Sequence, residues 1–134
     1  VRLRDGRVEV RSAERNWTVG QGAELRVRPD GTETHGAIPS HGVEWDWTLG
    51  VTPVPDFGGE PMSAFLAWVA RERGWSIAYA DAMTERSADS SILRGSLALL
   101  RVDEALEAAM TATGLRYRID RGTMVVSRTD PERR

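Results

Sequence analysis

Two helix-length apolar patterns, each closed by a glycine, constrain the fold of this chain more than any other feature. One starts at Pro61 and stops at Gly74, and the other runs from Val102 to Thr113 and stops at Gly114. A glycine directly after an apolar stripe is typical of a helix end. The stripes recur every three or four residues, as one buried helix face does: they are Met62, Phe65, Leu66, Val69 and the stem of Arg73, then Val102, Leu106, Ala109, Met110 and Thr113. The sequence therefore predicts two amphipathic helices.

Alternating segments around these helices predict strands. Residues 75–80 place Trp75, Ile77 and Tyr79 on one face, and residues 92–99 read as a strand kinked at Gly95. A final hairpin is expected from 115–120 and 123–127, with its turn at Arg121-Gly122. Residues 81–91 are polar and rich in alanine and serine, so we expect a loop there, with room for a helical turn. Together these segments predict a compact α+β domain.

Residues 1–48 predict an all-β half. Asp5-Gly6 is a favoured two-residue turn, so we expect residues 1–4 to pair with residues 7–10 in a hairpin. Further alternation continues through residues 16–28, and clear helix signals are absent up to Trp47. Residues 49–55 then read as a linker that precedes the α+β domain at 56–128, and 129–134 as a polar tail.

Two tryptophans stand close together before the linker. We expect Val43–Trp47 to be extended, which would place Trp45 and Trp47 on one face. Such a pair is expected to pack the β half onto the next part of the chain, because tryptophan is highly buried on average. The alternative is an exposed aromatic pair that binds a partner.

Composition excludes several classes. The chain is 40% apolar and 28% charged, as soluble globular proteins are, and it has no apolar run long enough for a membrane span. Its net charge of −2 gives no electrostatic reason to expect nucleic acid as a partner, and the signature loops and aromatics of common RNA-binding folds are missing. The opening residues are strand-like rather than a signal peptide, so we expect the chain to be a portion of a longer protein.

No set of residues fills the roles of a catalytic or metal site. His35 and His41 are the only histidines, and Glu44 three residues after His41 has no clear third ligand to join it. There is no cysteine, no nucleophile elbow and no phosphate-binding glycine loop. We therefore expect a binding module rather than an enzyme, with no catalytic residue, no cofactor and no metal.

An ordered set of residues resembles the FecR family of regulators. In the α+β segment the set is Phe57, Glu60-Pro61-Met62, Phe65-Leu66, Trp68-Val69-Ala70-Arg71-Glu72, Gly74, Leu93, Gly95-Ser96, Ala105-Leu106, Thr113-Gly114-Leu115 and Tyr117. This segment also resembles the short N-terminal (STN) domain of secretins and TonB-dependent receptors, a repeat of βαβ units. In residues 1–48 the set is Leu3-Arg4-Asp5-Gly6-Arg7-Val8, Val10, Trp17, Val19, Gly22, His41-Gly42 and Glu44-Trp45. These match the end of the FecR domain itself.

The resemblance implies both an architecture and a function. Residues 1–48 would be the end of a FecR-like β domain, and 56–128 an STN-like domain of βαββαβ type with two helices on a sheet. FecR-type proteins are anchored in the inner membrane by a single span, which would lie outside this chain. Their periplasmic part binds the signalling domain of a TonB-dependent outer-membrane transporter and thereby controls an extracytoplasmic-function sigma factor. The sequence does not name the transporter, its ligand, which need not be iron, or the sigma factor.

Four residues are the predicted partner-binding set, namely Trp68, Arg71, Trp45 and Trp47. Trp68 lies at the margin of the first helical stripe, where it fits equally an interface anchor and a boundary core residue. A second function stays open beside the regulator: an assembly domain of a secretin-like outer-membrane complex.

Overall fold

A computed structural model describes residues 1–129. The chain divides between Gly42 and Val43 into two compact units, each with its own secondary structure. Strands and helices are both present, so the predicted α+β class is confirmed. The predicted tail begins at Thr129, and its remaining residues 130–134 lie outside the described part of the chain.

The first unit consists of five short strands. They are β1 (Arg2–Leu3), β2 (Arg7–Arg11), β3 (Asn16–Gly20), β4 (Ala23–Val27) and β5 (Glu33–Ala37). β1, β4 and β5 form an antiparallel sheet in the order β1-β4-β5, and β2 pairs with β3. Val19 and Leu25 are its buried apolar residues, so the core of this unit is small.

The expected hairpin at Asp5-Gly6 is wrong. β1 pairs instead with β4, where Arg2 lies opposite Glu24, and the Arg2 Nε donates to Glu24 Oε1 at 2.6 Å. β2 pairs with β3 along all five of its residues, from Arg7 opposite Gly20 to Arg11 opposite Asn16. The longer ladder gives β2 more backbone hydrogen bonds than the expected hairpin would, because β1 is only two residues long.

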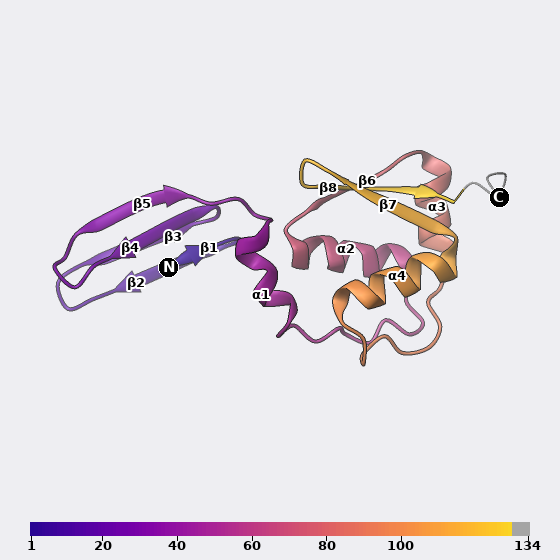
Figure 1. The fold of residues 1–134 in the computed structure, drawn as a ribbon, viewed down its shortest axis with the longest axis horizontal. Helices are drawn as coiled ribbons and strands as arrows, with labels where there is room; N and C mark the ends of the chain where they lie inside the picture. The colour runs from indigo at the N-terminus through magenta and orange to yellow at the C-terminus, as the bar shows by residue number, and fades with distance from the viewer. Residues whose placement is uncertain (130–134) are drawn as a thin grey trace. The chain divides into compact units, whose positions relative to one another are not determined.

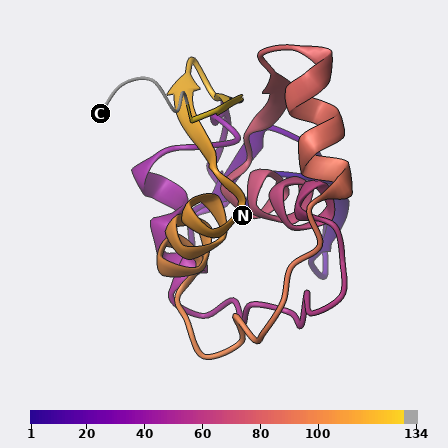
Figure 2. The ribbon, with the colours of Figure 1, turned by 90° about the vertical axis from the view of Figure 1, so that its right-hand side faces the viewer.

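The second unit carries a three-stranded sheet and all the helices found among residues 1–129 (Figure 1). Its elements are the 3-10 helix η1 (Val43–Trp45), α1 (Asp46–Leu49), α2 (Met62–Arg73), β6 (Ser76–Tyr79), α3 (Ala82–Ser90), α4 (Val102–Thr113), β7 (Leu115–Asp120) and β8 (Thr123–Arg128). β8 is central, parallel to β6 and antiparallel to β7. Helices α2 and α4 lie side by side on one face of this sheet, and α3 lies beside β6 (Figure 2).

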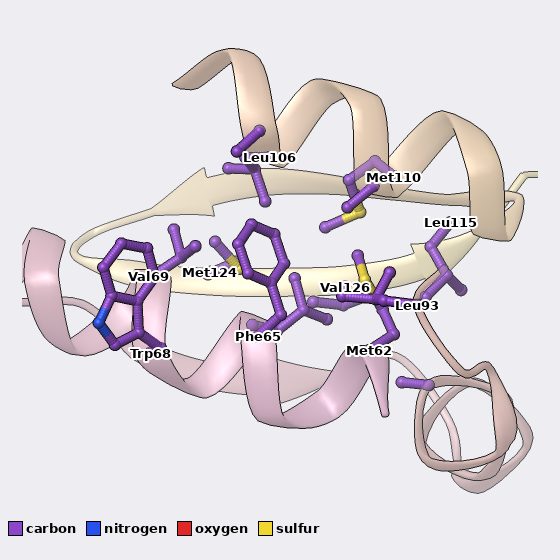
Figure 3. Packing of buried hydrophobic residues seen from close by; sticks show 14 of the residues in the cluster. Met62, Phe65, Trp68, Val69, Leu93, Leu106, Met110, Leu115, Met124 and Val126 are labelled. Carbon is purple, nitrogen blue, oxygen red and sulfur yellow. The ribbon is translucent and has the colours of Figure 1, made fainter. Parts of the chain in front are cut away.

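One continuous core holds this unit together (Figure 3). The apolar faces of α2 and α4 meet the inward side chains of β8, and Leu93 and Leu115 close the core between the elements. Its fully buried members include Met62, Phe65, Leu66, Val69, Leu106, Met124 and Val126. Burying side chains of this size is the main stabilising contribution available to so small a unit.

Both predicted helices form within a residue of their expected limits. Gly74 and Gly114 end them with φ of 71° and 66°, the left-handed conformation that a glycine adopts without a steric penalty. Arg101 supplies no side-chain cap to α4. The Glu104 carboxylate instead accepts a hydrogen bond from the Arg101 backbone N–H at 3.0 Å, so the otherwise weak start of α4 is stabilised.

The loop expected at residues 81–91 is wrong, because most of it forms α3. Asp81 caps this helix through its Oδ1, which accepts from the Thr84 backbone N–H at 2.7 Å and from the Thr84 hydroxyl at 3.0 Å. Thr84 and Ala88, one turn apart, are buried. A helix whose buried face is made of a threonine and an alanine carries little apolar periodicity, and the cap was its clearest sequence signal.

The strand expected at residues 92–99 is also wrong. This segment has an isolated bridge between Ile92 and Pro61 and then runs irregularly, with φ of 89° at Gly95. Its backbone bonds to the start of α2: Leu93 N–H donates to Glu60 O and Gly59 N–H donates to Leu93 O, both at 2.9 Å. In the described part of the second unit, η1 and α1 are therefore followed by α2, α3 and α4 and a three-stranded sheet, and the predicted βαββαβ order does not describe it.

Val43–Trp47 is helical rather than extended. η1 leads directly into α1, and the Thr48 hydroxyl donates to Trp45 O at 2.7 Å. Side chains two residues apart do not share a face of a helix, so Trp45 and Trp47 do not form the expected pair.

Replacing Phe65 by alanine should test the core directly. Phe65 is fully buried and contacts both Phe57 and Trp68, so we expect Phe65→Ala to lower the free energy of unfolding by about 3–5 kcal/mol. Urea denaturation followed by tryptophan fluorescence measures this change. The control is Met83→Ala on the exposed side of α3, which should change stability by less than about 0.5 kcal/mol. Equal effects of the two changes would contradict this core.

The cap of α3 should make stability depend on acid pH. Hydrogen bonds from Thr84 hold the pKa of Asp81 below its ordinary value of 3.8. A lowered folded-state pKa means that the contribution is present above the unfolded-state pKa and is lost as pH falls through the folded-state value. Asp81→Asn keeps an acceptor but removes the titration, so we expect its stability to fall less than that of the wild type below about pH 4. Identical acid profiles, measured by urea denaturation, would show that the cap contributes nothing to acid stability.

Candidate functional site

Trp68 lies in the core. Its side chain is 9% exposed, and its ring centroid lies 5.7 Å from that of Phe57 and 6.2 Å from that of Phe65. Figure 3 shows the indole among the buried residues of α2. A partner can therefore reach only the margin of this residue. Arg71, one turn further along α2, is exposed.

The two other predicted residues differ from each other. Trp45 is half-buried, whereas Trp47 is 67% exposed. Val43 and Val51, four residues before and after Trp47, are 82% and 72% exposed. The structure thus leaves one tryptophan of the pair, with two valines at helical spacing, open on the connection that precedes α2.

β7 is the longer of the two edge strands of the sheet in the second unit. β7 is six residues long and pairs, among residues 1–129, with β8 alone. The hairpin turns at Arg121-Gly122, with φ of 46° and 79°, and Asp120 lies opposite Thr123. In a two-residue hairpin the residues flanking the turn exchange hydrogen bonds, and such pairs recur at every second position.

The alternation of hydrogen-bonded and non-hydrogen-bonded pairs decides which backbone groups of β7 point away from β8. Asp120, Arg118 and Arg116 are bonded to β8, and Thr129 N–H donates to Gly114 O at 2.8 Å in the same register. Tyr117 and Ile119 lie between these pairs, so their N–H and C=O groups point away from β8. β7 therefore offers an unpaired ladder at its outer edge, which is a ready template for another strand.

Apolar and charged side chains alternate along β7. Tyr117 and Ile119 lie on the same face as the buried Met124 and Val126 of β8, yet they remain 37% and 42% exposed. On the opposite face lie the charged side chains Arg116, Arg118 and Asp120, all exposed. The Arg118 Nη1 is 3.3 Å from Asp120 Oδ2, and Arg116 Nε donates to Ser127 Oγ at 3.1 Å. The open edge is thus apolar on its inner side and mainly basic on its outer side.

A groove of about 570 Å³ runs between α4 and β7 beside this edge. It is lined by Glu107, Met110, Thr111, Gly114, Leu115, Arg116, Tyr117 and Thr129. Partial burial raises the pKa of the Tyr117 phenol, and the nearby carboxylates Asp103 and Glu107 raise it further against the opposing charge of Arg73, so the phenol stays protonated at neutral pH. A side chain entering the groove would meet apolar surface and this hydroxyl.

Arg73 holds α4 in place beside β7. Its guanidinium makes a close ion pair with Asp103 at the start of α4, and its Nη1 is 3.8 Å from Asp46 Oδ1 in α1. The guanidinium also lies 5.3 Å from the centre of the Trp75 ring. Arg73 was expected to contribute only its stem to the helix stripe, but its charged head joins the connecting helix to α4.

None of the four predicted partner-binding residues lies on β7, so the sequence did not identify this particular strand as a site. The signal was present in Leu115–Asp120, where apolar and charged residues alternate without proline, glycine or bulge. Such a strand is ordinary inside a sheet and becomes a site only at an edge, and the strand order was not predictable from this segment alone. Among residues 1–129 there is no cluster of three histidine, cysteine or acidic side chains placed to bind a metal. No helix in this range is long and apolar enough to span a bilayer.

Among known proteins, the chain is similar only to solved structures. No protein-family model and no curated protein sequence matches the chain. Two crystal structures of a proposed anti-sigma factor from Parabacteroides distasonis, at 2.50 Å and 1.65 Å resolution, align with 96% of this chain at 19% identity and a TM-score of 0.47. The chain spans 57% of the length of that protein.

Trp68 and Trp47 should respond in opposite ways to removal. Trp68→Ala empties a buried position and should lower the free energy of unfolding by about 3–5 kcal/mol. Trp47→Ala removes an exposed side chain and should change stability by less than about 0.5 kcal/mol. Urea denaturation of the two variants, followed by far-UV circular dichroism, checks the difference. A Trp68→Ala variant that unfolds cooperatively with wild-type stability would show that Trp68 is not a core residue.

Proposed function

We propose that this chain is the periplasmic sensing portion of a FecR-type regulator, and that it binds the signalling domain of a TonB-dependent outer-membrane transporter. Binding would be passed to the regulation of an extracytoplasmic-function sigma factor. The support from sequence is the ordered resemblance that runs through both units, from Leu3-Arg4-Asp5-Gly6 to Thr113-Gly114-Leu115. The periplasmic location and the absence of enzymatic activity are part of the same proposal.

The observation that carries a binding role is the open edge of β7. The core of the second unit is closed around α2, α4 and β8, yet Tyr117 and Ile119 stay partly exposed. Their backbone N–H and C=O groups point away from β8 and make no hydrogen bond to it. Exposed apolar side chains beside an unpaired ladder are costly to keep unless a partner covers them. Strand addition supplies affinity through the main chain and specificity through alternate side chains.

Binding to purified transporter signalling domains tests this function. The full chain should bind at least one signalling domain from the TonB-dependent transporters of its own organism, measured by isothermal titration calorimetry. Ile119→Asp places a charge on the apolar side of the β7 edge, so it should weaken that binding about tenfold or more.

The matched control is Ile92→Asp. Ile92 is also a partly exposed isoleucine of the second unit, but it lies beside Pro61 rather than in the sheet. We expect its affinity for the signalling domain to equal that of the wild type. Failure of every signalling domain to bind the folded wild-type chain would overturn the proposed function. Equal losses in the two variants would overturn the assignment of the site to β7.

A further inference from the structure

The charges around the β7 edge define what kind of strand it accepts. The hairpin formed by β7 and β8 carries four arginines, Arg116, Arg118, Arg121 and Arg128, and one acidic residue, Asp120. Arg116 and Arg118 stand on the outer face, at the two β7 positions that flank Tyr117. A strand added at this edge would place every second side chain directly beside these arginines.

On the inner face of the same edge, the side chains of β7 favour apolar side chains in the added strand. There an added strand would place its alternate residues beside Tyr117 and Ile119, both partly exposed and apolar. The groove between α4 and β7 continues from this side and is bounded by Met110 and Leu115. Apolar side chains at these positions would extend the existing core outward.

A second copy of this chain fits the edge poorly. If β7 paired antiparallel with β7 of another copy so that the two Tyr117 residues lay opposite each other, Arg116 of each copy would lie opposite Arg118 of the other. Shifted registers bring Asp120 opposite one of these arginines, but β7 has a single acidic residue, so no register places an acidic side chain opposite both. Like charges directly opposite each other destabilise a strand pair. The charges therefore act against self-pairing and favour a strand of opposite charge.

We propose that β7 binds an extended partner segment in which acidic and apolar residues alternate. The acidic side chains lie beside Arg116 and Arg118, the apolar ones lie beside Tyr117 and Ile119, and the backbone of the segment pairs with the outward groups of Tyr117 and Ile119. This inference rests on the proposed function in taking the segment from a partner protein. It assigns the strand at which that partner docks and the residue pattern that it presents.

Two capped peptides test the pattern with the full chain. In one, glutamate alternates with valine, and in the other lysine alternates with valine. We expect the glutamate peptide to bind about tenfold more tightly, and the double variant Arg116→Glu, Arg118→Glu to reverse this preference. The control variant Arg86→Glu, Arg94→Glu changes charge equally on exposed arginines of α3 and the following segment, and it should keep the wild-type preference.

Amide hydrogen exchange followed by NMR supplies the structural measurement. On binding the glutamate peptide, the amides of Tyr117 and Ile119 should become protected, while those of Arg116 and Arg118 are already protected by β8. Equal affinity for the two peptides, a preference that the charge reversal leaves unchanged, or unaltered exchange at Tyr117 and Ile119 would each overturn the inference. Concentration-dependent dimerisation of the wild type, lost in Ile119→Asp, would overturn it in favour of a second copy.

The peptide experiment separates this inference from the proposed function. If the peptides bind as expected but no transporter signalling domain does, the docking strand stands and the partner has to be sought elsewhere. If a signalling domain binds with full affinity to the Arg116→Glu, Arg118→Glu variant, the proposed function stands and the docking strand is wrong.

Discussion

The second unit depends on the contact between α2 and the central strand β8. The apolar face of α2, with Phe65 and Val69, packs on Met124 and Val126, and all four side chains are fully buried. α4 lies beside α2 on the same face of the sheet and adds Leu106 and Met110 to this core. β8 is thereby fixed in the middle of the sheet, and with three strands both of its neighbours are edges. The open β7 edge is a direct result of this small size.

Arg73 links the regions on either side of that core. It is held between Asp103 of α4, Asp46 of α1 and the ring of Trp75, while its buried Nε has no hydrogen-bond partner among the described residues. Leaving a donor of a charged group unsatisfied is costly, so the position is favoured only if both ion pairs and the ring contact are kept. Arg73 thus contacts both the connecting segment before α2 and the helix that flanks β7.

The elements that the sequence predicted well are those in which local signals and burial agree. α2, α4 and the final hairpin each have a clear apolar period and a glycine at the end or turn, and their limits are confirmed to within about a residue. The errors occur where a local signal was outweighed by tertiary pairing. Asp5-Gly6 does turn, but the strands beside it belong to different ladders. α3 buries so little apolar surface that only its Asp81 cap marked it.

The candidate site was harder to predict for a different reason. Trp68 was expected at the margin of a helical stripe and Trp47 on one face of a strand, and the structure buries Trp68 in the core while leaving Trp47 exposed. Whether a side chain is free depends on what packs beside it, which a single residue does not encode. The β7 edge is defined by strand order, a property of the whole unit.

Proteins protect open sheet edges against unwanted strand pairing in several ways, and the way used at β7 indicates which strands can still bind there. Proline or a bulge would block every incoming strand, and β7 has neither along its uninterrupted ladder with β8. It carries exposed arginines instead, which repel only strands of like charge. A blocked edge serves solubility alone, whereas a charged and otherwise regular edge also selects its partner. Arg116 and Arg118 therefore protect the chain against itself with the same charges that favour an acidic strand.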